Sequence, residues 1–511
     1  MTFNVVVVGA GSAGAVIASR LSEDESRSVA LIEAGPDYPS FDDLPAALKY
    51  GYASAADIAT DTHLWPYSAR ATRWQHETPL PRGRVTGGTS AINGQIFARG
   101  LPEDFDAWAA QGNEGWSFAD VEPVYRQLET DLDFDDEHHG RTGLVQVHRY
   151  PRDSWLPPQV AFHEACLAAG YEDCPDMNAP YSSGAGPLPF NNVGGIRASS
   201  ALTYLAAARG RPNLHVLAET TARRLLVGGS RIRGVEVACG NALDVIEGDE
   251  YVLAAGAVGS PHLLLLSGIG PVRDLERAGV RVALDLAGVG ANLRDHQVVD
   301  VWWERGAALD VPADAPVVQV ALRYTASGSR LRNDMKITIR NRLTIPGTDS
   351  AVAERTLSIV PGLELASGSG TLRIASSSAD VQPVVQLNFL EEESDRARLR
   401  EGVLLSLELA GDAGLGALVG RRLSPADEDI ASAAALDDWL MRSVRTSHHI
   451  CGTCKMGPAA DEAAVVDRHG RLHGIENLRV GDASICPDVV RANLNATTMM
   501  IGERIADFMR A

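Results

Sequence analysis

The chain has 511 residues, of which 45% are hydrophobic and 22% charged, so its composition is that of a folded globular protein and excludes disorder as the main state. Its formal net charge of −20 argues against a basic, nucleic-acid-binding surface. Six cysteines are too few for a disulfide scaffold at this length, and the length alone suggests about three domains.

We expect no targeting segment, because Met1–Asn4 runs directly into apolar residues 5–8. No stretch reaches the roughly 18 apolar residues of a transmembrane helix, and the densest run, Leu263–Ile269, is too short. We therefore expect a cytoplasmic protein without a transmembrane segment. The sequence indicates nothing about its oligomeric state.

The first 35 residues are typical of a βαβ unit. Residues 3–8 predict a buried parallel strand, residues 10–21 a helix, and residues 29–32 a second strand. The turn between the first strand and the helix has glycine at the first, third and sixth positions of residues 9–14. This G-x-G-x-x-G pattern, in its strand–turn–helix context, predicts a dinucleotide-binding site.

Each glycine of this turn has a distinct physical role. Gly9 permits the tight turn, Gly11 lets a pyrophosphate approach the backbone, and Gly14 lets the helix pack closely on the strand. The pyrophosphate then lies at the helix N-terminus, beside Ser12 and Ala13, where unpaired N–H groups favour negative charge.

Glu33, with Ala34 after it, stands where the second strand ends, about 20 residues beyond the glycine turn. A carboxylate there accepts hydrogen bonds from a ribose diol and repels a 2′-phosphate. These residues predict a dinucleotide without choosing between NAD and FAD.

Two later segments favour FAD. Residues 250–256 predict a strand that ends in Ala255 and Gly256, followed by a helix over His262–Ser267 with Ser260-Pro261 at its start. Residues 477–482 predict another strand, which ends at Asp482. Strands that return to the nucleotide so late in the chain fit FAD, whose length needs contacts beyond the first βαβ unit. Three unrelated strands of one sheet remain the alternative.

The middle of the chain predicts a different architecture. Residues 371–374 and 384–388 predict antiparallel strands, and residues 391–410 predict a long helix. Residues 304–316 and 345–352 predict polar loops. We therefore expect nucleotide-binding segments at both ends of the chain and a mostly β region between them.

Four further segments resemble signatures of the glucose–methanol–choline (GMC) oxidoreductases. They are residues 81–94, residues 256–271, residues 449–457, and residues 477–484 together with 493–503. With the N-terminal glycine motif and Glu33, the matching segments follow the order of the family along the whole chain.

The resemblance implies an α/β plus α+β fold. It implies a Rossmann-like, discontinuous FAD-binding domain over residues 1–155, 200–297 and 441–511. It also implies a substrate domain, built on an antiparallel sheet, over residues 156–199 and 298–440.

The resemblance also implies how FAD is held. Members with a histidyl-linked flavin carry the linking histidine where this chain has Ile92, so we predict non-covalent FAD. Asn93 and Gly88 are expected near the reactive face of the flavin, and Asn495 and Thr497 at its pyrimidine end. The other contacts that the resemblance implies, besides those named above, are Arg82, Gly87, Gly94, Ala222, Ala483 and Ala496.

The chemistry that the resemblance implies is oxidation of an alcohol, which we expect to be primary, to the aldehyde or ketone by hydride transfer to flavin. Removing the hydroxyl proton needs a base of near-neutral pKa, which is the range of histidine. His449 matches the family base, and Asn493 matches the group that holds the substrate oxygen. The proline that the family often has after this asparagine is Leu494 here. The expected partners are a small-molecule alcohol and oxygen or another electron acceptor.

Other functions stay open. The main alternative is a flavin-containing lyase of the same fold, similar to hydroxynitrile lyases. A nicotinamide dehydrogenase and a non-catalytic flavin-binding protein are further alternatives. More narrowly, residues 449–454 are similar to those of bacterial pyridoxine 4-oxidases, although Asn493 is not typical of them.

Several reactive side chains are expected to be structural. We expect His448 to hydrogen-bond backbone rather than border the pocket, and the acidic run over residues 131–137 to be solvated. Cys451 and Cys454 have a spacing that also suits zinc or a redox pair, but we expect neither, and no metal. Ordinary structural roles are expected for His63, His76, His138, His139, His473, Met499 and Met500.

Overall fold

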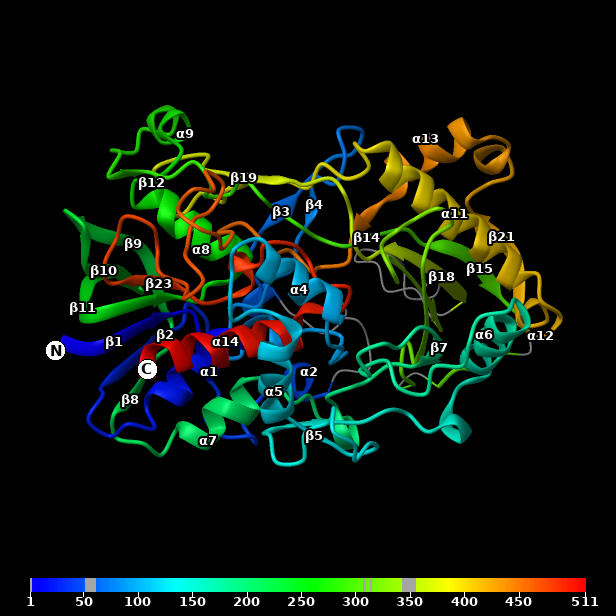
Figure 1. Ribbon diagram of the computed structural model, residues 1–511, viewed down its shortest axis with the longest axis horizontal. Helices are drawn as coiled ribbons and strands as arrows, with labels where there is room; N and C mark the ends of the chain where they lie inside the picture. The colour runs from blue at the N-terminus through cyan, green and yellow to red at the C-terminus, as the bar shows by residue number, and fades with distance from the viewer. Residues whose placement is uncertain (1, 51–60, 307–308, 313–314, 342–354) are drawn as a thin grey trace.

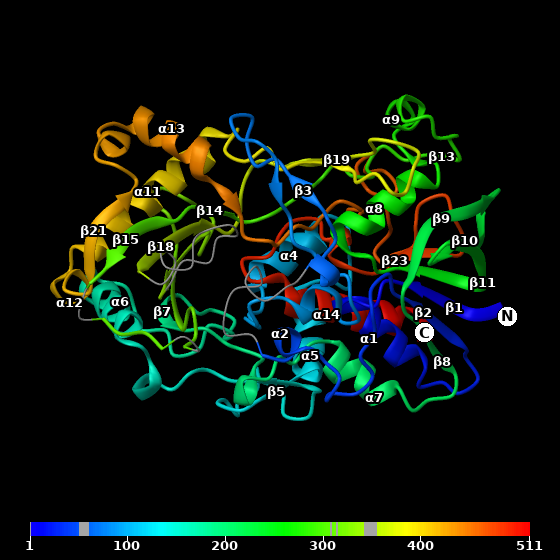
Figure 2. The ribbon, with the colours of Figure 1, turned by 180° about the vertical axis from the view of Figure 1, so that it is seen from behind.

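The computed structural model describes the chain except residues 1, 51–60, 307–308, 313–314 and 342–354. The expected loop over residues 345–352 therefore lies outside the described residues. Two sheet-based parts lie side by side along the longest axis, and both termini belong to the same part (Figures 1 and 2). A mixed α/β part thus lies beside an α+β part, as expected.

The first sheet has seven strands in the order β8-β2-β1-β11-β10-β9, with β23 beside β11. The strands β1, β2, β8, β11 and β23 run parallel, whereas β9 and β10 extend the sheet in antiparallel fashion. Their bounds are Thr2–Val8 (β1), Val29–Ile32 (β2), Leu214–Leu217 (β8), Thr220–Gly228 (β9), Arg231–Cys239 (β10), Ala242–Leu253 (β11) and Leu478–Val480 (β23). Segments from the start, middle and end of the chain therefore form one sheet.

Two helices that pack against each other carry their N-termini to the same place. They are α1 (Ser12–Leu21) and α14 (Leu494–Arg510). Their backbones approach so closely at Gly502 that a Cβ there would lie only 2.9 Å from the carbonyl oxygen of Ala13. At their N-terminal ends, the Ser12 hydroxyl donates to Asn495 Oδ1 over 2.9 Å. The N-terminal glycine turn and the C-terminal signature therefore meet.

The helix expected over His262–Ser267 begins earlier than its sequence indicates. It is α8 (Gly256–Leu266), which starts directly after β11 and has Pro261 in its interior. The proline lacks an N–H for the Ala257 carbonyl oxygen, and the Thr453 hydroxyl donates to that oxygen instead, over 2.7 Å. Ser260 is no N-cap: its hydroxyl donates to Asp482 Oδ2 over 2.5 Å.

The second sheet has eight strands in the order β21-β15-β18-β17-β16-β7, with β14 beside β18 and β22 beside β14, and all its pairs are antiparallel. The helices α6 (Pro157–Ala168) and α11 (Glu393–Ala410) pack against it (Figure 1). The strand bounds are Gly184–Pro187 (β7), Gln297–Val298 (β14), Val301–Arg305 (β15), Val320–Tyr324 (β16), Met335–Arg340 (β17), Thr356–Leu363 (β18), Val419–Ser424 (β21) and Arg445–Thr446 (β22).

The burial pattern of β17 shows which face of this sheet α11 covers and which face is open toward the first part of the molecule. Its residues alternate between buried and half-buried, and Met335 points to α11, where a Cβ on Gly402 would meet its methyl carbon at 2.9 Å. Lys336, Thr338 and Arg340 therefore lie on the opposite face, toward the first part of the molecule.

The expected strands of the middle region occupy a different place. They are β19 (Thr371–Arg373) and β20 (Val384–Gln386), which pair antiparallel as predicted but form their own small sheet against α8 and β3 (Ser68–Ala69). Conversely, β22 joins the second sheet although it falls in the segment assigned to FAD binding. The domain boundaries themselves stay a prediction.

The remaining elements connect and cover these sheets. They are α2 (Ala46–Lys49), β4 (Thr78–Pro79), α4 (Pro102–Ala110), α5 (Phe118–Leu128), β5 (Glu129–Asp131), β6 (Val145–Val147), α7 (Ala206–Ala208), β12 (Ile269–Gly270), α9 (Val272–Arg277), β13 (Leu284–Asp285), α12 (Ala413–Gly416) and α13 (Ala433–Ser443).

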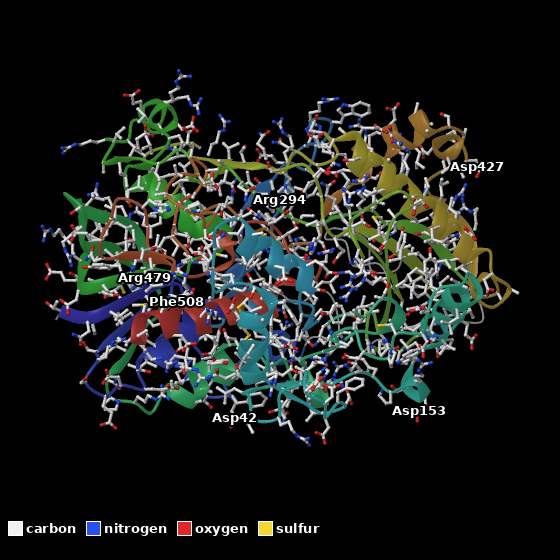
Figure 3. All side chains as sticks on the ribbon, in the orientation of Figure 1. Asp42, Asp153, Arg294, Asp427, Arg479 and Phe508 are labelled. Atoms are coloured by element: carbon white, nitrogen blue, oxygen red, sulfur yellow. The ribbon has the colours of Figure 1, made fainter. Side chains whose placement is uncertain are left out.

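The acidic charge is spread over the outer surface, where exposed Asp42, Asp153 and Asp427 project from different edges (Figure 3). Among the helices that the structure describes, none is both long and apolar enough to cross a membrane.

Candidate active site

One large cavity, of about 1030 Å³, runs from the glycine turn to the second sheet. It begins where β1, β2, β11 and β23 end, which is the edge at which open α/β sheets bind ligands. Among its lining residues are most of those expected to bind cofactor: Gly9, Gly11, Ser12, Ala13, Glu33, Ala34, Arg82, Gly88, Asn93, Gly94, Ala222, Ala255, Gly256, Asp482, Ala483 and Asn495.

The glycine turn has the shape of a pyrophosphate cradle. Gly9 has a φ of +104°, and a Cβ there would lie 2.5 Å from the Ala254 carbonyl oxygen. A Cβ on Gly14 would lie 1.9 Å from the Gly9 carbonyl oxygen. A Cβ on Gly11 would have more room, because its nearest neighbour, Gly88 Cα, would lie 3.8 Å from it. No side chain caps α1, so its first N–H groups are available to an anion.

Glu33 also fits a dinucleotide. Its Oε2 accepts from the Ala10 N–H over 3.0 Å and its Oε1 from the Gly35 N–H over 2.9 Å. Burial raises the pKa of this carboxyl to about 7, against the opposing effect of these hydrogen bonds. Each carboxylate oxygen keeps a lone pair for a ribose hydroxyl, so the cradle and the carboxylate together suit FAD.

Four expected cofactor contacts do not line the cavity: Gly14, Gly87, Ala496 and Thr497. Gly14 has the packing role expected of it, and Gly87 lies in the turn before residues 88–91. Thr497 differs from the expectation that it lies at the pyrimidine end of the flavin, because its hydroxyl hydrogen-bonds Tyr125 Oη over 2.8 Å, within the core. Residues 494, 495 and 498 share one face of α14, so Thr498 lines the cavity instead.

Pairing of β14 with β22 brings two histidines together. Gln297 lies opposite Thr446, so His296 and His449 lie close to each other, with their Nδ1 atoms 2.8 Å apart. Asp295 holds both segments, since its Oδ1 accepts from the His296 N–H over 2.8 Å and from the His449 N–H over 2.9 Å. His296 carries no motif that we recognised, and sequence reasoning missed it.

The contacts of His296 assign the tautomer of His449. His296 Nε2 lies 2.9 Å from the Val490 carbonyl oxygen, which can only accept, so Nε2 carries the proton. In neutral His296 the Nδ1 atom then accepts from His449 Nδ1–H. The lone pair of His449 is therefore on Nε2, which lies 3.1 Å from Asn493 Nδ2.

The surroundings keep His449 uncharged. Burial lowers its pKa well below the ordinary value, and the positive charges of Lys336 and Arg82 lower it further. Both His449 and Asn493 line the cavity, so a neutral imidazole nitrogen and an amide converge on one point of it. Such a pair can accept a proton from a hydroxyl group and hold its oxygen.

His448 differs from expectation, because its side chain is exposed to the cavity and does not bond backbone. Its φ of +66° turns the side chain into the cavity, while its main chain donates to the Thr446 hydroxyl over 2.7 Å and accepts from Arg82 Nη1 over 2.9 Å. Since protein encloses the cavity, burial lowers the pKa of His448 to about 3, with nearby arginines adding to the effect.

The cysteine pair is unsuited to metal or redox chemistry as it stands. Cys451 and Cys454 are both buried, and burial raises the pKa of each thiol well above the ordinary value. The thiol that Cys451 contacts is Cys486, not Cys454. Neither sulfur is therefore a thiolate at neutral pH.

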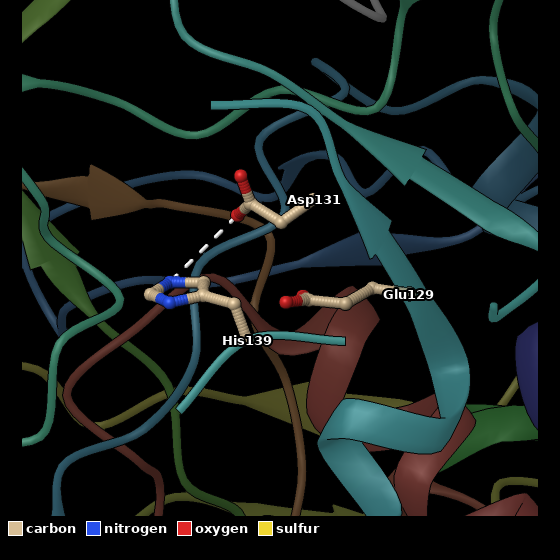
Figure 4. Close-up of side chains that lie close together, drawn as sticks. All are labelled: Glu129, Asp131 and His139. Atoms are coloured by element: carbon tan, nitrogen blue, oxygen red, sulfur yellow. Dashed lines mark ion pairs between the residues drawn. The ribbon is translucent and has the colours of Figure 1, made fainter. Parts of the chain in front are cut away.

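Outside the cavity, Glu129, Asp131 and His139 form a buried cluster (Figure 4). Arginines satisfy its charge: Arg99 contacts Glu129, and Arg149 Nη1 lies 2.5 Å from Asp131 Oδ2. Asp131 thus corrects the expectation of a solvated run, although the exposed residues Asp133, Asp135, Asp136 and Glu137 agree with it. The cluster is an internal ion network.

The rest of the cavity wall carried no sequence motif. Its aromatic lining is made of Trp65, Tyr67, Tyr150 and Phe190, and its basic lining at the second sheet of Arg340 and Arg445. These side chains come from loops and strand ends far apart in the sequence, so only the fold brings them together.

The fold and the site define an FAD-dependent oxidoreductase, in which a dinucleotide cradle continues into a pocket with a neutral histidine. The family model described as GMC oxidoreductase matches residues 3–298 with its N-terminal part and residues 366–502 with its C-terminal part. The chain belongs to this family, and is an enzyme that acts on CH–OH groups.

Known relatives span the whole chain. An oxygen-dependent choline dehydrogenase of Klebsiella pneumoniae is 35% identical and covers 100% of this chain and 96% of its own length. The mitochondrial choline dehydrogenase of Homo sapiens is 33% identical, covering 99% of this chain and 90% of its own. Among solved structures, pyridoxine 4-oxidase from Mesorbium loti has a TM-score of 0.92 at 30% identity, with 99% of both chains covered.

Proposed function

We propose that the protein oxidises a primary alcohol to the aldehyde, with His449 as the base. The observation that carries this proposal is the convergence of His449 Nε2 and Asn493 Nδ2, 3.1 Å apart, in the cavity that continues from the dinucleotide cradle. Choline and pyridoxine, named by the relatives, both carry a primary alcohol, which supports the same chemistry.

The residues of this chain have separate roles in the proposed reaction. The glycine turn, Glu33 and the N-terminus of α14 would hold FAD without a covalent bond, and bound FAD would supply the hydride acceptor. His449 Nε2 takes the hydroxyl proton, and His296 keeps the proton of His449 on Nδ1. The Asn493 amide donates to the oxygen as negative charge develops there.

The test is anaerobic reduction of the bound flavin by a panel of primary alcohols, followed by stopped-flow absorbance. His449→Ala should lower the reduction rate by about 10²- to 10⁴-fold. Asn493→Ala should lower it by about 10²- to 10³-fold. Both variants should keep their FAD. His76→Ala, which removes an exposed histidine outside the cavity, is the matched control.

Wild-type reduction rates in both variants would refute the assignment. A flavin that stays oxidised while the substrate is cleaved would instead identify the lyase alternative. Repeating the panel with oxygen present identifies the electron acceptor, because only an oxidase reoxidises its flavin rapidly in air. A cytoplasmic location stays a prediction.

A further inference from the structure

Two neighbouring histidines, His448 and His449, line the same cavity. They follow the strand β22, and successive residues of an extended chain point to opposite faces. His448 departs from the extended conformation, because its φ of +66° lies in the left-handed region. This turn brings both side chains to one cavity, so the wall carries a second imidazole beside the proposed base.

The main chain of His448 is held from two sides. Its N–H donates to the Thr446 hydroxyl over 2.7 Å, and its carbonyl oxygen accepts from Arg82 Nη1 over 2.9 Å. The Thr446 hydroxyl in turn donates to Asp295, whose other carboxylate oxygen accepts from the His449 N–H. One carboxylate thus positions both histidines, and neither main-chain bond depends on which side chain stands at position 448.

The imidazole of His448 differs from that of His296 in its contacts. Both ring nitrogens of His296 have hydrogen-bond partners within the protein. Within the described part of the chain, the hydrogen bonds of His448 are those of its main chain, and its side chain is exposed to the cavity. Glycine or asparagine would adopt the positive φ with less strain, so the turn alone does not account for an imidazole here.

The state of this imidazole defines the group that it can bind. Because burial and nearby arginines keep the pKa of His448 at about 3, the ring is neutral at neutral pH. A neutral ring has one N–H donor and one acceptor nitrogen, and no described residue fixes which nitrogen is which. A hydroxyl group can donate and accept, so it suits either tautomer. A quaternary ammonium group has no hydrogen-bonding atom and would gain no hydrogen bond from this residue.

We propose that His448 binds a second hydroxyl group of the substrate, so that the enzyme prefers an uncharged diol to an alcohol with a single hydroxyl. The proposal rests on the proposed alcohol oxidation and adds its substrate class. With the reacting hydroxyl at His449 Nε2 and the second hydroxyl at the adjacent residue, the substrate is held at two points, which orients its carbinol carbon.

Binding to the reduced, FAD-loaded enzyme tests the subsite without turnover, because reduced flavin accepts no hydride. Anaerobic, ligand-observed NMR titrations compare each diol from ethane-1,2-diol to hexane-1,6-diol with the 1-alkanol in which a methyl group replaces the second hydroxyl. At the matching spacing, His448→Phe should lower the ratio of diol affinity to alkanol affinity about tenfold. His76→Phe, which changes an exposed histidine outside the cavity, should keep the wild-type ratio.

Two further variants separate hydrogen bonding from backbone conformation. His448→Gly adopts the turn without strain but offers no side-chain hydrogen bond, so it should match His448→Phe, and it takes the place of that variant if His448→Phe does not retain FAD. His448→Asn tolerates the positive φ and can still donate and accept, so it should recover part of the preference. A wild-type ratio in His448→Gly at every spacing would overturn the subsite, and weaker FAD binding in that variant alone would assign the imidazole to the cofactor instead.

Anaerobic flavin reduction in the oxidised wild type then separates the two proposals. A binding preference for a diol that depends on His448, with no alcohol reducing the flavin, would contradict alcohol oxidation and leave the subsite standing. Flavin reduction by the 1-alkanols, with the same affinity ratio in the wild type and in His448→Gly, would support alcohol oxidation and contradict the subsite.

Discussion

At the scale of single residues, the hydrogen bond between His296 and the Val490 carbonyl decides which nitrogen of His449 is basic. His296→Ala removes the acceptor of His449 Nδ1–H, so we expect flavin reduction to slow by about 10- to 100-fold, as for other residues that orient a catalytic group. His296→Gln can still accept from His449 and donate to Val490, and should recover part of the rate. Equal rates in the two variants would contradict the orienting role.

The low pKa of His449 predicts how the reaction depends on pH. A base must be unprotonated, so lowering the pH through its pKa removes activity. Because that pKa lies well below 6.5, the rate constant for flavin reduction by a neutral alcohol should be constant from pH 6.5 to 8 and fall only in more acidic solution. Stopped-flow measurements across this range check it, and a decline already centred above pH 6.5 would be inconsistent with His449 as the base.

Ile92 lines the cavity where a linking histidine would stand, and its side chain has no nucleophile. The flavin should therefore be released when the protein is denatured and precipitated. The absorbance of the supernatant measures this release. Yellow colour that remains with the precipitated chain would show a covalent bond elsewhere.

At the scale of elements, the interior proline of α8 makes the helix depend on a residue far along the chain. Thr453→Val leaves the Ala257 carbonyl oxygen without its side-chain donor, and we expect a loss of about 1–3 kcal/mol of stability. Thermal melting of the FAD-loaded protein measures the change, with the exposed Thr142→Val as control. A melting temperature equal to that of the control would contradict this role.

The start of α8 also shows where sequence reasoning failed. Ser260-Pro261 has the composition of a helix start, but the close approach of Gly9 to Ala254 and the bond between Ser260 and Asp482 fix the helix start at Gly256. The βαβ unit, the strand beside Asp482 and α11 were predictable, because local periodicity determines them. His296 was not, because only the pairing of β14 with β22 brings it to His449. Arg340 and Arg445 were not, because they reach the cavity from strands far apart in the sequence.

At the scale of the whole molecule, the ion network at His139 joins segments of both predicted domains. Its charged groups are Asp131, Asp136, Asp176, Glu129, Arg99 and Arg149. Burial opposes protonation, yet the hydrogen bonds to Asp176 and Asp136 raise the pKa of His139 overall. A protonated His139 therefore stabilises the fold below the unfolded pKa of about 6.5, and this contribution is lost as the pH rises through the folded pKa.

We expect the melting temperature of the wild type to fall further between pH 6 and pH 9 than that of His139→Gln. The exposed His76→Gln serves as control, because it should follow the wild type. The same pH slope in all three proteins would show that His139 contributes no charge to the network.

The strand β23 and the N-terminus of α14, which complete the cofactor edge of the first sheet, come from the last part of the chain. A ribosome synthesises them after the other strands of the first sheet. The first βαβ unit can form early, but until then β11 lacks its neighbour β23 and the flavin end of the cavity lacks a wall. Cofactor loading therefore has to follow the synthesis of these segments, and a nascent chain that stalls before residue 478 carries an incomplete site.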